Sequence, residues 1–254
     1  AIALPWGMNF WTPQTGKMGD GWTYRYDAHR IRGIKQTHQP SPWINDYGQF
    51  SIMPVRDVSK TDEEARASYY SVYLADHDVK AEVAPSDRAA VLRFTFPDSK
   101  NSGVIADAFD KGSYIKVIPE EQTIVGYTTR NSGGVPENFR NWFVMKFDRP
   151  FESVQVYNGK DAVSGNEFEG EHALAAVKFA TRRGDKVNVA VASSFISLEQ
   201  AYTNLREVEG KDLEAVKADA KARWNDILGR IEVSGGSTDQ YRTFYSCLLY
   251  TSPS

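Results

Sequence analysis

The chain has 254 residues, of which 41% are hydrophobic and 25% are charged, and its formal net charge is −3. This composition is close to the globular average and excludes a disordered, collagen-like or membrane-spanning chain. The dispersed Lys and Arg residues do not indicate a basic nucleic-acid-binding face, and a polybasic membrane-binding patch is absent from the sequence. The single cysteine, Cys247, excludes a disulfide framework and fits the cytosol or the periplasm.

The first 50 residues are rich in Trp, Gly, Pro and Tyr, and this composition predicts loops. From Phe50 onward, short runs of strand-forming residues alternate with turn signals such as Asn158-Gly159. The absence of helical patterns between most of these runs predicts a mainly β chain, folded as an antiparallel β-sandwich. The expected strands cover residues 50–55, 69–74, 91–96, 104–108, 114–118, 123–129, 142–147, 154–157, 173–180 and 187–192.

The hydrophobic period changes after Ser197, from that of strands to that of helices. A short helix is expected over 198–205 and a longer one over 212–228, with Gly229 as its stop. A strand over 231–233 and a helix opening at Ser237 or Thr238 follow. The change of period predicts a boundary between a β part, 1–197, and a helical part, 198–254.

Aromatic residues crowd the segment from Trp6 to Tyr47, which includes Trp22 and Trp43. Sugars bind surfaces of this kind, because their C–H faces stack on rings while their hydroxyls pair with polar tips. The alternative is a proline-stiffened loop whose Trp residues close one end of the sandwich. Asp46 either binds a sugar hydroxyl or forms an Asx-turn before Gly48.

Histidines offer one further candidate. His38 lies between polar residues and prolines, and it either contacts substrate or braces its loop. His29, His77 and His172 are isolated in sequence and are assigned to the surface. The sequence contains no zinc-site spacing, phosphate-binding loop or nucleophile elbow. Its acidic residues are scattered, so no pair of glycosidase carboxylates can be chosen from them.

An ordered set of motifs resembles glycoside hydrolase family 92, the bacterial exo-acting α-mannosidases. The similarity runs from about Trp6 to Tyr250. The segments that carry it are Trp6-Gly7-Met8, Trp11-Thr12-Pro13-Gln14-Thr15, Gly33-Ile34, Thr37-His38-Gln39-Pro40-Ser41-Pro42-Trp43, Asp46-Tyr47-Gly48, Gly134-Val135-Pro136-Glu137-Asn138-Phe139, Ser194-Phe195-Ile196-Ser197-Leu198-Glu199-Gln200-Ala201, Trp224-Asn225 and Phe244-Tyr245.

The resemblance implies an N-terminal β-sandwich joined by linker helices to an (α/α)₆ barrel, with the active site between the two domains. It implies an inverting, calcium-dependent enzyme acting on mannose-containing glycans. The catalytic acid and base, and most calcium ligands, are then expected in the barrel, so no catalytic or metal-binding residue is assigned in this chain. The motif assigns His38 and Gln39 to the substrate pocket, with Trp22, Trp43 and Asp46 as weaker candidates.

Two departures from the family pattern lead to further expectations. The family's Asn-Pro-Phe opening does not precede Ala1, and residues 251–254 do not continue the pattern, which predicts truncation at both ends. Residues 198–254 are then a helical linker and the truncated start of the catalytic domain. We expect this chain alone to be inactive and the enzyme to be periplasmic or secreted, with a role in N-glycan degradation. The alternative function is a non-catalytic carbohydrate-binding sandwich module.

Overall fold

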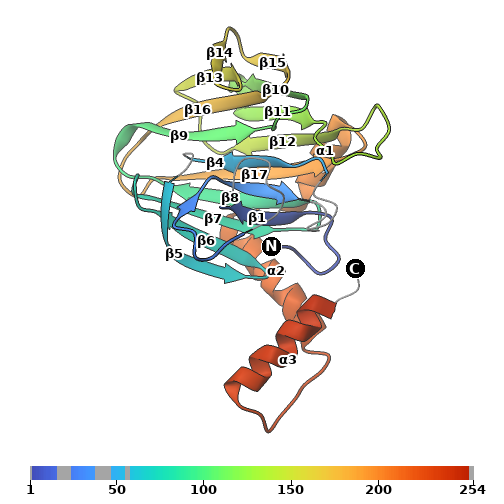
Figure 1. Cartoon of the computed structure of the whole chain (residues 1–254). Coiled ribbons are helices and arrows are strands. Elements are labelled where there is room, and N and C mark those ends of the chain that lie inside the picture. Colours follow the sequence, from blue (N-terminus) through green and yellow to red (C-terminus); the bar gives the residue numbers. More distant parts are fainter. Residues whose placement is uncertain (1, 16–23, 38–46, 55–57, 252–254) are drawn as a thin grey trace.

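The structure, a computed structural model, describes residues 2–15, 24–37, 47–54 and 58–251, with side chains to residue 248. Its described strands form two antiparallel sheets that lie face to face, and helices cover the outer side of the second sheet (Figure 1). The predicted mainly β sandwich is therefore confirmed. Among the described residues, no helix is long and apolar enough to cross a membrane.

The first sheet has seven described strands in the order β1-β3-β4-β9-β16-β13-β14. In this sheet, β3 and β4 flank the segment 38–46, which contains most of the predicted pocket residues. The bounds are β1 (Phe10–Gln14), β3 (Gly33–Thr37), β4 (Phe50–Met53), β9 (Ser99–Asp107), β16 (Ala173–Thr181), β13 (Ser153–Asn158) and β14 (Asp161–Val163).

The second sheet has ten described strands in the order β15-β10-β11-β12-β17-β8-β7-β6-β5-β2. A short 3₁₀ turn, η1 (Pro119–Glu121), precedes β11. The strand bounds are β15 (Glu167–Gly170), β10 (Ser113–Ile118), β11 (Thr123–Thr128), β12 (Asn141–Phe147), β17 (Lys186–Ser194), β8 (Ala89–Thr95), β7 (Val79–Pro85), β6 (Tyr69–Leu74), β5 (Val58–Arg66) and β2 (Arg30–Ile31).

The side-chain alternation of the second sheet creates two cores. On β12, Phe143 and Met145 belong to the large cluster between the sheets, whereas Val144 belongs to a smaller cluster beneath the helices. This is the period of two that strands impose. Phe50 of β4 stacks on Phe143 of β12 with ring centroids 4.6 Å apart, so side chains of the two sheets interlock at these strands.

The helices begin at the predicted positions. Helices α1 (Leu198–Leu205) and α2 (Leu213–Leu228) are capped by Ser197 and Asp212, whose side chains accept backbone N–H groups. The 3₁₀ helix η2 (Arg206–Val208) joins them, and α3 (Thr238–Thr251) follows. The apolar face of α2 buries Leu213, Val216 and Ala220, while Trp224 is half-buried and donates from Nε1 to the Ala3 carbonyl over 2.9 Å.

A buried ion pair also fixes α2 to the sheet. The Glu82 carboxylate on β7 is 3% exposed and accepts from Arg93 on β8 over 2.8 Å and from the Tyr69 hydroxyl over 2.6 Å. Arg93 also reaches Glu214 on α2 over 2.7 Å. Burial alone would raise the pKa of Glu82, but the hydrogen bonds from Arg93 and Tyr69 outweigh it and lower the pKa to about 2.

Two sequence predictions about the elements were wrong. The first 50 residues contain strands β1, β2 and β3, although their Trp and Pro content favoured loops. The edge position of β1 explains how a strand tolerates Pro13, since an edge strand need not donate from every residue. Residues 231–233 form no strand: Ile231 and Val233 are exposed, and no described strand pairs with them, as a strand requires. Each of the ten strands predicted between Phe50 and Ala192 corresponds to a described strand, although β4 ends at Met53.

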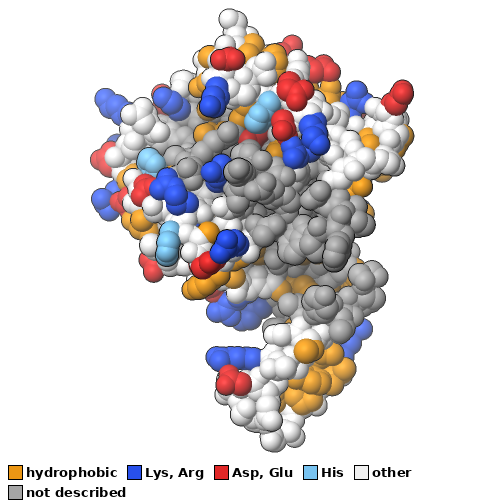
Figure 2. Space-filling view, viewed as in Figure 1, with side chains coloured by type: hydrophobic (Ala, Val, Ile, Leu, Met, Phe, Trp, Pro, Cys, Tyr) orange, Lys and Arg blue, Asp and Glu red, His pale blue; other side chains and the backbone are white. Residues whose placement is uncertain are grey.

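Helix α3 projects away from the sandwich beyond the end of α2 (Figure 1). Figure 2 shows hydrophobic side chains gathered on one flank of this projecting part. The partly exposed apolar residues of α3 are Tyr241, Phe244, Tyr245 and Leu248. The predicted boundary between 1–197 and 198–254 remains a prediction, and α1 together with the first half of α2 packs on the sandwich.

Candidate functional site at the base of segment 38–46

The five site residues predicted from sequence, Trp22, His38, Gln39, Trp43 and Asp46, lie outside the described residues. The structure places the residues on either side of segment 38–46. Thr37 ends β3 and is fully buried, and Tyr47 is followed by Gly48 and β4. The candidate site therefore consists of the described residues around Thr37 and Tyr47.

Three buried polar side chains link the two sheets at this point. Gln36 of β3 donates from Nε2 to the Ser193 hydroxyl of β17 over 2.8 Å. Asn141 of β12 donates from Nδ2 to the Gly48 carbonyl over 2.6 Å and to Gln36 Oε1 over 3.4 Å. Gln36 and Asn141 are fully buried and Ser193 is 6% exposed. Buried hydrogen bonds of this kind specify one arrangement, because breaking them leaves polar groups unsatisfied.

Gly48 fits tightly between β12 and the residues that follow β17. Its φ is +66°, and its N–H donates to the Arg130 carbonyl over 2.8 Å. A Cβ at this position would lie 2.5 Å from Asn141 Cβ and 2.8 Å from Phe195 Cε1. The preceding Tyr47 donates from its hydroxyl to the Gly133 carbonyl over 3.1 Å. The chain leaving segment 38–46 is thus fastened to the loop between β11 and β12.

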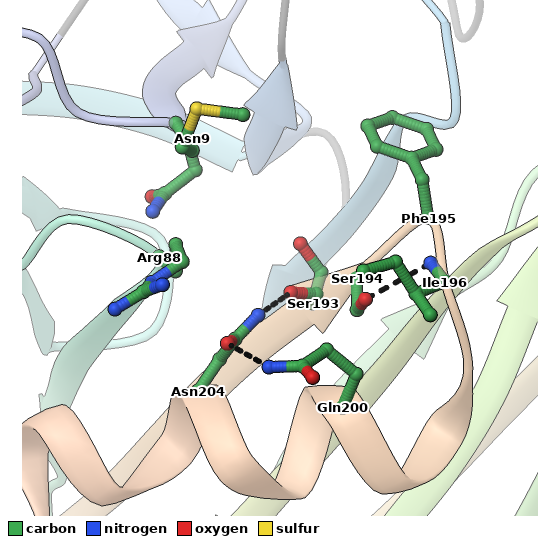
Figure 3. A pocket seen from close by; sticks show the side chains of 9 residues that line it. Asn9, Arg88, Ser193, Ser194, Phe195, Ile196, Gln200 and Asn204 are labelled. Atoms are coloured by element: carbon green, nitrogen blue, oxygen red, sulfur yellow. Dashed lines mark hydrogen bonds between the residues drawn. The ribbon is translucent and has the colours of Figure 1, made fainter.

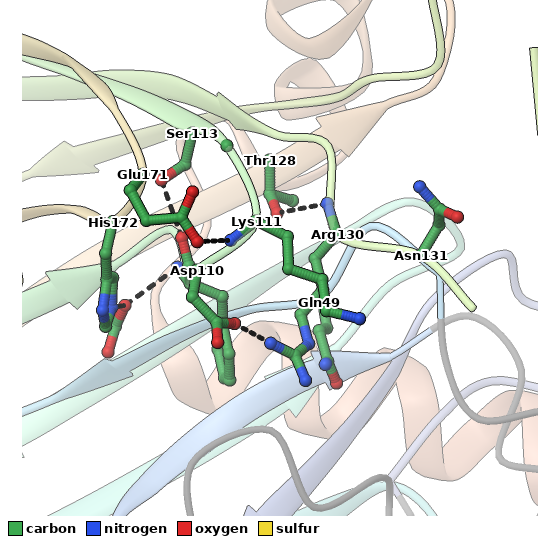
Figure 4. A network of polar contacts seen from close by, with 12 residues as sticks. Gln49, Asp110, Lys111, Ser113, Thr128, Arg130, Asn131, Glu171 and His172 are labelled. Atoms are coloured by element: carbon green, nitrogen blue, oxygen red, sulfur yellow. Dashed lines mark hydrogen bonds and ion pairs between the residues drawn. The ribbon is translucent and has the colours of Figure 1, made fainter. Parts of the chain in front are cut away.

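A charged network lies beside this point (Figure 4). Arg130 forms an ion pair with Asp110, and the Lys111 N–H donates to Glu171 over 3.3 Å. Buried Lys35 of β3 donates to Gln49 Oε1 over 3.0 Å. The first two interactions hold the carboxylates of Asp110 and Glu171 in place beside the residues that contact Gly48.

His172 corrects one sequence prediction. Its isolation in sequence assigned it to the surface, but its Nε2 lies 2.7 Å from Oδ1 of Asp107, and the His172 side chain is only 22% exposed. Asp107 is 1% exposed and also accepts the Phe109 N–H over 2.9 Å. Their contact runs between neighbouring strand ends of the first sheet, which sequence spacing does not reveal. His29 and His77 are exposed, as predicted.

The residues that follow the Trp22 segment are held by contacts with β5. The Tyr24 hydroxyl donates to the Glu63 carboxylate over 2.7 Å, and Lys60 forms an ion pair with the same carboxylate. Lys60 also donates to the Tyr26 carbonyl over 3.2 Å. The side chains of Lys60 and Glu63 are 4% and 8% exposed, so β5 supplies a rigid support for the chain that follows residue 23.

A hollow of about 200 Å³ opens beside Ser193 (Figure 3). On its α1 side, Asn204 donates to the Ser193 carbonyl over 2.8 Å and accepts from Gln200 over 3.0 Å. Its rim includes the exposed apolar side chains of Met8 and Ile196, 63% and 79% exposed. Exposed apolar groups around a hollow are typical of a contact surface.

Sequence reasoning missed Gln36, Asn141 and Ser193. Each lies at one end of a row of inward-pointing side chains on its strand. The other side chains in such a row are usually apolar. In the described part of the chain, no three His, Cys, Asp or Glu side chains form a group that could hold a metal ion. We therefore assign no calcium ligand among the described residues and derive no chemistry from calcium here.

Comparison with known families supplies two matches. The N-terminal domain model of glycosyl hydrolase family 92 matches residues 1–194, and the catalytic domain model of the same family matches residues 200–253. No curated protein sequence matches the chain significantly.

Solved structures give consistent results. A family 92 inverting mannosidase from Bacteroides thetaiotaomicron superposes with a TM-score of 0.95 at 42% identity, over 98% of this chain and 36% of its own. A family 92 α-mannosidase from the same organism, in complex with mannoimidazole, gives 0.83 at 25% identity, over 92% and 35%. A further family 92 hydrolase shares the fold, with a TM-score of 0.79 at 20% identity, over 96% and 37%. The chain thus spans little more than a third of these relatives.

Proposed function

The chain belongs to glycosyl hydrolase family 92, and we propose that it is the sandwich and linker part of an inverting exo-α-mannosidase. The observation that carries this proposal is the family match along both parts of the chain, together with the likeness to an inverting mannosidase. In the proposed enzyme, a carboxylic acid of the (α/α)₆ domain protonates the leaving oxygen and a second carboxylate activates water. A separation of about 6.5–9.5 Å between them leaves room for that water.

The role proposed for this chain is to present segment 38–46 to the substrate. His38 and Gln39 would bind mannose hydroxyls, with Trp22, Trp43 and Asp46 nearby. The buried contacts of Gln36 and Asn141, and the hydrogen bonds of Tyr47 and Gly48, support the proposal, because they hold the segment's ends in one position. Binding groups held in place in advance lose less entropy when the substrate binds.

The (α/α)₆ domain is proposed to pack on the sandwich. The apolar flank of α3 and the exposed side chains of Met8 and Ile196 support this proposal, since both surfaces would be covered in such an arrangement. The calcium ligands are proposed to lie in that domain. We also propose a periplasmic or secreted location and a role in degrading mannose-containing N-glycans, as family membership suggests.

A chimera tests the proposed function. It joins this chain to the catalytic domain of the 42% identical Bacteroides mannosidase. The chimera is expected to hydrolyse mannobiose, and ¹H NMR is expected to detect β-mannose as the first product, since the reaction inverts the anomeric centre. The 254-residue chain alone is expected to show no turnover, because its catalytic acid and base are proposed to lie elsewhere.

A folded chimera that releases no mannose, or releases α-mannose first, would contradict the proposal. Turnover by the 254-residue chain alone would contradict the assignment of acid and base to the other domain. The non-catalytic module predicts an inactive chimera, so the same assay separates the two functions.

The pocket role of His38 gives a second expected result. In the chimera, His38→Ala is expected to lower kcat/KM about 10- to 100-fold, because a buried substrate hydroxyl loses its partner. The melting temperature is expected to change little. The exposed His77 provides the control: His77→Ala should leave kcat/KM unchanged. A fall in melting temperature without a fall in kcat/KM would instead show that His38 braces its loop.

A further inference from the structure

A second cavity lies on the outer face of the second sheet, between that face and the helical segment from α1 to η2. It measures about 750 Å³ and lies within the size range of small-ligand sites. Lys146 of β12 and Ala190 of β17 line its sheet side, and Tyr202 of α1 and Arg206 of η2 line its helical side. We call it the strap groove, because α1 and η2 cross the sheet as a strap.

The strap groove is separate from the candidate site. Asn141 begins β12 at the candidate site, and Lys146 lines the groove near the end of the same strand. Five residues of strand span about 17 Å. The described residues that hold segment 38–46, including Gln36 and Ser193, do not line the groove.

The walls of the groove are fixed. Asn204 of α1 is bonded to the Ser193 carbonyl of β17, and Val208 of η2 is 2% exposed within the cluster beneath the helices. Glu121 of η1 and Tyr202 of α1 both line the groove, and partial burial together with the charge of Glu121 raises the pKa of Tyr202. The cavity is therefore formed before any ligand binds.

The lining points to a neutral ligand rich in hydroxyl groups. Its ionisable side chains balance, with three acidic and three basic groups: Glu121, Asp148, Glu209, Lys146, Arg206 and Lys211. Within the described chain, the side chains of Glu121, Lys146, Arg206 and Glu209 make no hydrogen bond or ion pair, so donors and acceptors of both kinds remain available. The Tyr202 ring, 37% exposed, adds an apolar face beside them.

We propose that the strap groove binds a neutral oligosaccharide, away from the described residues Gln36, Asn141 and Ser193. A sugar ring would lie against Tyr202, and its hydroxyls would pair with the charged side chains on both walls. An anionic ligand is disfavoured because the acidic side chains offset the basic ones. The groove would hold a glycan chain while its end is processed elsewhere.

Binding of mannotriose to the unaltered 254-residue chain tests the proposal, by titration calorimetry and by NMR chemical-shift mapping. We expect a millimolar Kd, with shifts at residues of the groove. Tyr202→Ala should weaken binding about tenfold, Tyr202→Phe should retain it, and the exposed control His77→Ala should leave it unchanged. Mannose 6-phosphate should bind no better than mannose.

The proposal would be overturned if no binding were detected at mannotriose concentrations up to about 20 mM, or if Tyr202→Ala bound mannotriose as tightly as the unaltered chain. Loss of binding in His38→Ala, with shifts away from the groove, would assign the sugar to the pocket and also overturn it. If Tyr202→Ala does not fold, the shift mapping on the unaltered chain decides. Activity of the chimera does not enter this test, so the failure of either proposal can be recognised separately.

Discussion

Replacing Arg93 by Met is expected to lower the free energy of unfolding by about 3–5 kcal/mol, because it leaves the Glu82 carboxylate buried without its main partner. Glu82 is 3% and Arg93 12% exposed at the side chain. Lys80 lies 3.2 Å from Glu82 but is half exposed, so it offsets only part of the loss. Urea unfolding followed by circular dichroism measures the change.

A matched control is the exposed pair of Arg183 and Asp78, whose side chains are 79% and 44% exposed. Arg183→Met should change stability by less than about 0.5 kcal/mol. The double variant Glu82→Gln with Arg93→Met should recover part of the stability, since no charge then remains buried. Equal effects of Arg93→Met and Arg183→Met would contradict the importance given to the buried pair.

The same pair predicts a pH dependence. The pKa of Glu82 falls from its ordinary value of 4.5 to about 2 on folding. Its contribution to stability is therefore complete above pH 4.5 and is lost as the pH falls from 4.5 towards 2. Removing Arg93 raises the pKa of Glu82 in the folded state, so the acid dependence of Arg93→Met should be shallower in this range.

Replacing Gly48 by Ala is expected to destabilise the protein by about 2–5 kcal/mol. A left-handed backbone costs an L-residue about 1–2 kcal/mol, and overpacking adds about 1–3. The added Cβ would meet Asn141 Cβ at 2.5 Å and Phe195 Cε1 at 2.8 Å. Since Gly48 follows segment 38–46 so closely, the displacement should also lower kcat/KM in the chimera.

Gly159 supplies a control with matched backbone geometry. Its φ is +60°, and a Cβ there would meet nothing within 4 Å. Gly159→Ala should therefore show the conformational cost alone, and the difference between the two variants measures the contact with Asn141 and Phe195. Equal losses in both variants would show that packing at Gly48 is unimportant.

The strands that could be predicted from sequence are those with regular patterns. The inward positions of β17, Val187, Val189 and Val191, alternate with outward ones, as a half-buried strand requires. Strand β1 was missed because Pro13 opposes a strand assignment unless the strand lies at a sheet edge, and edge position is a property of the whole fold.

The candidate site was harder to predict because its described residues come from distant segments. Ser193 continues the inward series of β17, and Asn141 precedes the inward series of Phe143, Met145 and Phe147 on β12. A polar residue in such a series is a usable signal for a buried contact. The partner could not be inferred, since Gln36 meets Ser193 across 157 positions of sequence.

Helix α2 connects the sandwich to α3, so a tilt of α2 changes the position of α3. Its first half is clamped to the sandwich through Leu213, Val216 and Ala220, whereas α3 is attached beyond its other end. The eight residues of α2 that follow Ala220 span about 12 Å, so a tilt of about 10° in this half would move its far end by about 2 Å. Small changes in the packing beneath α2 would therefore displace α3. Substitutions far from the predicted pocket residues could in this way change the orientation of α3.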